Sequence, residues 1–191
     1  MLGYAFTWLK SNAALGGWDI NVVTGGMPQK VATAMGEINE QLLGATYDPI
    51  AYLGKQVANG TNHAVLALQT VVYKEPVKNI VIIKFNENGM DCNLYAIEPL
   101  IEGGPAFGGY AVEPKIGDAI DPEDIKAFEA VTSGWVGSAV HPVALLATRI
   151  TKGTDLVFLA TVTPVYPNAK ATVKLVRVNA LTKSIDFEDV L

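Results

Sequence analysis

The chain has 191 residues, of which half are hydrophobic and 17% are charged, and its formal net charge is −5. This composition can bury a core and excludes a disordered chain. Because the charge is spread along the chain and forms no basic patch, we expect neither a nucleic acid nor a membrane as partner.

The sequence contains few signals for a cellular compartment. The longest apolar run, "NIVIIKF", is too short to span a bilayer, and "MLGYAFTWLK" lacks the basic and long apolar regions of a signal peptide. Cys92 is the only cysteine, so no disulfide forms within the chain. We therefore expect a protein that is secreted if a signal was removed, and cytoplasmic otherwise.

The N-terminal segment carries three aromatic residues, Tyr4, Phe6 and Trp8, in alternate positions. A period of two predicts a β-strand, which would be added to a sheet. If this strand is unpaired, its side chains form an exposed contact site.

An internal repeat organises the rest of the chain. Shifting the sequence against itself by 93 residues matches it without a gap from Gly44 onward, with twelve identities. A shift of one residue less aligns "GGW" near the N-terminus with "GGY" at 108–110. This pattern indicates a duplicated unit of about ninety residues. We predict a first unit over 1–98, a Gly- and Pro-rich linker over 99–107, and a second unit over 108–191.

Each unit has the same predicted elements. Apolar residues at helical spacing predict helices over about 28–43 and 122–136, the second with Asp121 as N-cap and Pro122 in the first position. The strands are predicted over 50–58, 61–73, 78–86 and 91–98 in the first unit, and over 143–151, 154–165, 171–179 and 184–190 in the second. The prediction is an α+β fold, with one helix packed on a four- to five-stranded antiparallel sheet in each unit.

The stretch "KQVANGTN" predicts the first hairpin. Asn59 and Gly60 lie between two β-like runs, which is typical of a two-residue type I′ turn. A second turn is predicted at Glu87, Asn88 and Gly89.

The motifs "LGGW" and "QVANGTNHAVLAL" together resemble the cystatin family. Gln56, Gly60, Thr61 and Asn62 match the Gln-x-Val-x-Gly hairpin and the Thr-Asn that often follows it. Ala58 stands where the family usually has Val. The resemblance covers each unit nearly end to end, and the chain also looks like a group of bacterial cystatin-like domains without an established activity.

The resemblance implies an inhibitor that inserts a wedge into the groove of a papain-like cysteine protease. Its partner-binding residues would be a Gly-Gly trunk, the first hairpin and the second turn: Gly16, Gly17, Gln56, Val57, Ala58, Asn59, Gly60, Asn88 and Gly89. The second unit has Arg149, Ile150 and Lys152 in the corresponding hairpin, so we do not expect it to inhibit through the same contacts. A monomer or a hairpin-swapped dimer is expected.

The alternative is that these residues serve the fold alone, in a protein-interaction or structural module without a protease target. The sequence contains no metal-ligand cluster, nucleotide loop or catalytic dyad, so we expect no enzyme, no cofactor and no metal. We interpret His63 and His141 as structural or surface residues, and Cys92 and Trp135 as packed core residues. Gly25 and Gly26 are interpreted as a bend into the first helix.

Overall fold

The computed structural model describes residues 16–104 and 108–191, so the N-terminal aromatic segment lies outside the described residues. The described part forms ten strands and two α-helices, listed here in chain order: β1 (Trp18–Thr24), α1 (Gln29–Gln41), β2 (Ala45–Ala58), β3 (Gly60–Val71), β4 (Val77–Asn88), β5 (Asp91–Glu102), β6 (Ala111–Ile116), α2 (Pro122–Thr132), β7 (Ser138–Thr151), β8 (Gly153–Pro164), β9 (Thr172–Asn179) and β10 (Ser184–Asp189). A short 3-10 turn, Gly117–Ala119, precedes α2.

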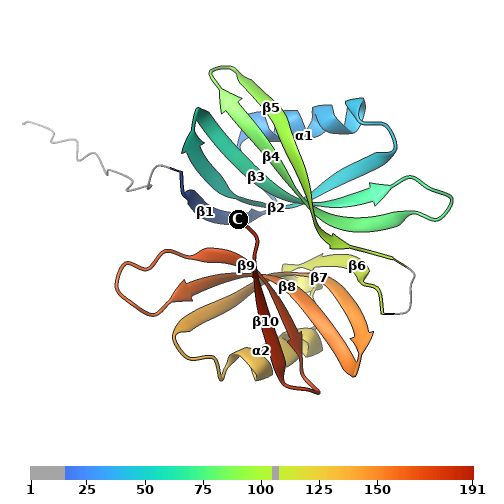
Figure 1. Cartoon of the computed structure of the whole chain (residues 1–191), viewed down its shortest axis with the longest axis vertical. Coiled ribbons are helices and arrows are strands. Elements are labelled where there is room, and N and C mark those ends of the chain that lie inside the picture. Colours follow the sequence, from blue (N-terminus) through green and yellow to red (C-terminus); the bar gives the residue numbers. More distant parts are fainter. Residues whose placement is uncertain (1–15, 105–107) are drawn as a thin grey trace, which may run out of the picture.

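The strands form two antiparallel five-stranded sheets. Sheet 1 has the order β1-β2-β3-β4-β5, and sheet 2 has the order β10-β9-β8-β7-β6. In Figure 1 the two sheets lie against each other, with α1 and α2 on their outer sides.

The inner faces of the two sheets share one hydrophobic core. Leu53, Leu66 and Ile80 of sheet 1 belong to the same buried cluster as Leu146 and Leu159 of sheet 2. The outer face of each sheet forms a second cluster with its own helix. The long strands are therefore buried on both faces, which accounts for continuous apolar runs such as "IVII" at 80–83.

The predicted α+β fold class is wrong, because the fold is mostly β: the described residues form two antiparallel five-stranded sheets and contain only two α-helices. The helices are shorter than predicted, and strand β2 begins at Ala45, five residues before the predicted start. The Gly-Gly-aromatic segments lead into two further strands, β1 and β6. The prediction assigned only one face of each sheet to the core, and so missed the sheet-to-sheet contact.

The two sheets repeat the same strand bounds and bulges at the spacing of the sequence repeat. The bounds of β2 and β7 differ by 93 residues, as do those of β3 and β8. The bulge between Pro49 and Ala51 recurs between Pro142 and Ala144. The predicted cap of the second helix is confirmed, since the side chain of Asp121 accepts a hydrogen bond from Glu123 N.

The predicted linker begins too early. Strand β5 continues to Glu102, into the stretch that we assigned to the linker.

Over the described ranges, no helix has the length and apolar character needed to cross a membrane.

Candidate functional site

The β2–β3 hairpin ends in a three-residue loop. Val57 pairs with Thr61, and the tight loop between them contains Ala58, Asn59 and Gly60, with Ala58 opposite Gly60 and Asn59 at the tip. Gly60 has a positive φ of 93°, whereas Asn59 does not have a positive φ. A type I′ turn needs a positive φ at both central residues, so the predicted turn type is wrong. The geometry fits the three-residue loop that ends in a left-handed glycine.

Gly60 is also required by its neighbour on β4. A Cβ atom at Gly60 would lie 2.4 Å from the carbonyl oxygen of Glu87, which is far closer than van der Waals contact allows. The hairpin loop can therefore lie against β4 only because residue 60 has no side chain.

A chain of side-chain amides holds this loop in place. Asn86 Nδ2 donates to Asn59 O at 3.1 Å and to Asn62 Oδ1 at 2.8 Å. Asn62 Nδ2 donates to Gln56 Oε1 at 2.9 Å, and Gln56 Nε2 donates to Gly16 O at 2.7 Å. The chain thus connects β4, both strands of the hairpin and the Gly-Gly segment. Gln56, which we predicted as a partner-binding residue, uses its amide within the protein.

The second unit builds the same support with charged groups. Arg149 and Asp155 stand at the repeat positions of Gln56 and Asn62, and their side chains form an ion pair of 2.7 Å. Asn179, at the repeat position of Asn86, donates to Asp155 Oδ1 at 2.7 Å and to Lys152 O at 3.3 Å. The repeated motif therefore encodes a supported hairpin loop, with an amide pair in one unit and an ion pair in the other.

The turn between β4 and β5 is held from helix α1. Lys30 Nζ lies 2.6 Å from Glu87 Oε1 and donates to Gly89 O at 2.7 Å. The other carboxylate oxygen of Glu87 lies 3.1 Å from His63 Nε2, and His63 Nδ1 lies 2.9 Å from the Tyr52 hydroxyl. His63 is 4% exposed and is a buried, hydrogen-bonded residue, in keeping with a structural role.

Within this network, the pKa of one group, Glu87, is lowered, and the pKa of another, Tyr52, is raised. Hydrogen bonds from Lys30 and then from His63 lower the pKa of the Glu87 carboxyl, which stabilises its ionised form. Burial raises the pKa of Tyr52 to about 12, with smaller contributions from the charges of Asp19 and Glu87. The ionised Glu87 carboxylate selects the tautomer in which His63 Nε2 donates a hydrogen bond to it and His63 Nδ1 accepts a hydrogen bond from the Tyr52 hydroxyl.

The structure brings the predicted site residues together at one end of sheet 1. Gln56 bonds to Gly16, and Thr61 of the first hairpin pairs with Glu87 beside the second turn. Figure 1 shows the β2–β3 and β4–β5 tips side by side. Most of the predicted residues are exposed there: Gly16, Gly17, Val57, Ala58, Asn59, Asn88 and Gly89. Gln56 and Gly60 are half-buried.

The sequence analysis missed two participants, Lys30 and Tyr52, and it placed Glu87 in the second turn without predicting its ion pair. Tyr52 and Glu87 are brought together through the pairing of β2, β3 and β4, whereas Lys30 reaches Glu87 from helix α1. The repeat did contain a signal, because positions 56 and 62 change together from an amide pair to an ion pair.

Two of the predicted core residues are less buried than expected. Trp135 is 46% exposed and contacts Phe187 with 4.8 Å between ring centroids, so its assignment to the core is wrong. Cys92 is half-buried, at the margin of the α1 cluster.

Gly25 has a positive φ of 81° and stands just before α1, where a bend was predicted.

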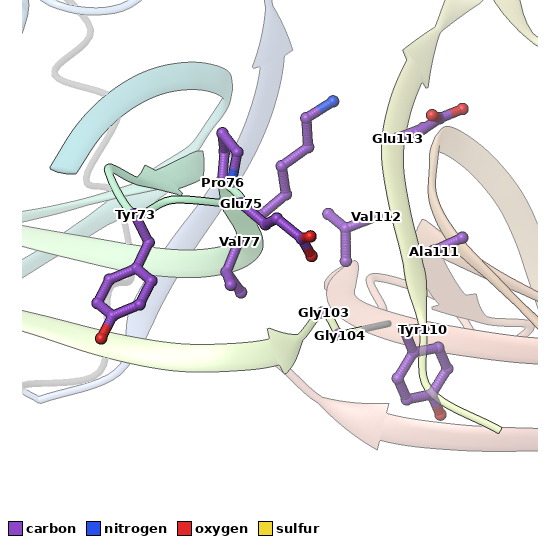
Figure 2. A pocket seen from close by; sticks show the side chains of 11 residues that line it. Tyr73, Glu75, Pro76, Val77, Gly103, Gly104, Tyr110, Ala111, Val112 and Glu113 are labelled. Carbon is purple, nitrogen blue, oxygen red and sulfur yellow. The ribbon is translucent and has the colours of Figure 1, made fainter. Parts of the chain in front are cut away.

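A separate hollow of about 410 Å³ lies where the β3–β4 turn, the end of β5 and strand β6 meet. Figure 2 shows Tyr73, Glu75, Val112 and Glu113 around it. The hollow also borders Gly104, after which residues 105–107 are not described. In the described chain, no three or more His, Cys, Asp or Glu side chains gather as a metal site.

Comparisons of the chain with protein-family models, with curated proteins and with solved structures find no match.

The ionised carboxyls at the two hairpins make stability depend on pH. Burial acts to raise the pKa of Asp155, but hydrogen bonds from Asn179, Arg149 and Thr151 outweigh it and bring the pKa below its ordinary value of 3.8. A lowered folded-state pKa gives stability that is present above the ordinary pKa and is lost as the pH falls through the folded-state value.

We therefore expect the unfolding free energy of Asp155→Asn to fall less steeply than that of the wild type as the pH is lowered below 3.8. Urea denaturation at each pH measures this slope. Asp91→Asn, which removes an exposed carboxyl, is the control for the loss of one charge. An unchanged acid slope in Asp155→Asn would contradict the assignment.

Proposed function

We propose that the tip end of sheet 1 is a protein-binding wedge and that the protein is a non-enzymatic inhibitor of papain-like cysteine proteases. The wedge consists of Gly16 and Gly17, the β2–β3 loop and the β4–β5 turn. The observation that supports it is the meeting of these three segments, each tied to the next by hydrogen bonds.

The support of the loops favours a binding role for this end. A loop that is already held in its bound shape loses little conformational entropy when it docks. The amide chain and the Lys30–Glu87 ion pair hold both tips, while apolar side chains point outward: Val57 is 49% exposed and Met90 is 92% exposed. These side chains can be buried by a partner at little cost.

The second candidate is a protein-interaction or structural module without a protease target. It is favoured by the second unit, which supports its hairpin equally well although its loop has different residues. Loop support can therefore serve the fold as well as binding, and the partner must be tested directly.

Val57 provides the test, because its side chain lies at the tip and is half exposed. We expect the wild type to inhibit papain in a titration with a fluorogenic peptide, and Val57→Asp to weaken inhibition at least about tenfold, since binding would then bury a charge. Gln56→Ala is less suitable, because it would also break the hydrogen bond to Gly16.

Ile150→Asp is the matched control, since Ile150 stands at the repeat position of Val57 and is 79% exposed. It introduces the same charge at a loop of the same geometry, and we expect it to leave inhibition unchanged. Wild-type protein that fails to inhibit at tens of micromolar, or Val57→Asp that inhibits as well as wild type, would rule out the wedge and favour the second candidate.

A further inference from the structure

A polar hollow lies on the helix side of sheet 1, between the start of α1 and strands β1 to β3. It has a volume of about 510 Å³, and its lining includes Asp19, Tyr52, Gly54, Lys55 and His63. Asp19 and Lys55 are exposed partners across the β1–β2 ladder, while Tyr52 and His63 are buried. The hollow thus joins two opposite charges with a buried polar pair.

The second unit has apolar or uncharged residues at every one of these positions. Leu145 and Leu156 replace the buried Tyr52 and His63. Ala111 and Thr148 replace Asp19 and Lys55 and pair with each other in the same register, and Ala147 replaces Gly54. A sheet of the same geometry is therefore built without these polar groups, so the fold alone does not account for them.

Neither Asp19 nor Lys55 forms an ion pair within the described chain. Asp19 and Lys55 face each other across the ladder, yet their side chains form neither a salt bridge nor a hydrogen bond with any described residue. Both groups therefore remain available at the hollow, one for a cation and one for an anion.

The buried pair adds an acceptor to the acidic side. The Tyr52 hydroxyl donates a hydrogen bond to His63 Nδ1, because His63 Nε2 donates to the Glu87 carboxylate. The Tyr52 oxygen is then left with lone pairs only. With the Asp19 carboxylate nearby, this part of the hollow suits a group that donates several hydrogen bonds, such as an ammonium.

We propose that the polar hollow binds a small zwitterion with the chemistry of a free α-amino acid. Its ammonium lies at Asp19 and the Tyr52 oxygen, and its carboxylate lies at Lys55. The volume of the hollow is within the range of small-molecule sites. This site is independent of the protease-binding wedge and is tested without a protease.

Three ligands of one carbon skeleton test the proposal by NMR titration of the full chain: L-leucine, 3-methylbutylamine, which lacks the carboxylate, and 4-methylpentanoate, which lacks the ammonium. We expect L-leucine to shift the amide signals of Asp19, Lys55 and His63 saturably, and each truncated ligand to bind at least about tenfold more weakly. Absence of a saturable shift up to about 20 mM L-leucine, or equal affinity for leucine and the amine, would overturn the proposal.

Variants assign the two ends of the ligand. Lys55→Met should remove the preference for L-leucine over 3-methylbutylamine, and Asp19→Asn should remove the preference over 4-methylpentanoate. Both residues are exposed, so the variants should fold. Lys152→Met, which removes an exposed lysine of the second unit, is the control and should bind as wild type does. If Lys55→Met still binds L-leucine more tightly than 3-methylbutylamine, the proposed orientation of the ligand is wrong.

Discussion

Replacing Gly60 by alanine should lower the free energy of unfolding by about 2–4 kcal/mol. Two costs add at this position. The residue has a φ of 93°, a conformation that strains any side chain, and its Cβ would lie 2.4 Å from Glu87 O. A backbone oxygen cannot move without disturbing the β3–β4 ladder. Urea denaturation of the purified variant measures the loss.

Gly153→Ala is the matched comparison, because Gly153 has nearly the same φ of 94°. There the nearest atoms to a new Cβ are Leu181 Cβ at 3.0 Å and Asn179 Oδ1 at 3.2 Å, so the contact is much looser than the 2.4 Å approach at Gly60. We expect a smaller loss of about 1–2 kcal/mol, mainly from the backbone strain. Equal losses in the two variants would show that the close approach to Glu87 has no energetic weight.

The second large effect is expected for Asn179→Ala, with a loss of about 2–3 kcal/mol. Asn179 is 2% exposed, and its amide nitrogen donates to the Asp155 carboxylate at 2.7 Å. Its oxygen accepts from the backbone N–H groups of Leu181 and Thr182. The variant removes a donor from a buried charge and the acceptor of two N–H groups, and each of these changes is costly.

Asn86→Ala provides the comparison in the first unit. Asn86 is only half-buried, and its partners, Asn62 Oδ1 and Asn59 O, are uncharged. Hydrogen bonds between neutral groups contribute about 1 kcal/mol, so we expect a loss of that size. Thermal or urea denaturation of both variants distinguishes the cases, and a larger loss for Asn86→Ala would contradict the assigned networks.

Local sequence signals predicted the hairpins, because Asn59–Gly60 and Asn88–Gly89 interrupt β-like runs. They did not predict the turn type at Gly60, since that depends on how closely β4 approaches. The cap at Asp121 was predictable because it involves residues two positions apart. The ion pair of Lys30 and Glu87 was not, because it depends on where α1 crosses the sheet.

The fold class was mispredicted for a related reason. The run "IVII" at 80–83 is apolar in consecutive positions, which is typical of a strand buried on both faces. We assigned the helix to one face of each sheet and assigned nothing to the other face. The pattern does not indicate what packs against the second face. In the structure, the sheet of the other unit packs there. The three segments of the candidate site were predictable, while the contacts that hold them depend on the strand register and on the position of α1.

The shared core also bears on how this chain originated. Equivalent positions of the two units meet in it: Ala51 with Ala144, Leu53 with Leu146 and Leu66 with Leu159 are identical pairs within one buried cluster. Contact between equivalent patches is the form of an interface in a symmetric homodimer. The outer faces have diverged more, with Tyr52 and His63 facing α1 where the other copy has two leucines. The fold therefore has the form of an ancestral dimer joined into one chain. A substitution on one inner face must fit the inner face of the other unit, whereas the outer-face residues of each unit can change independently.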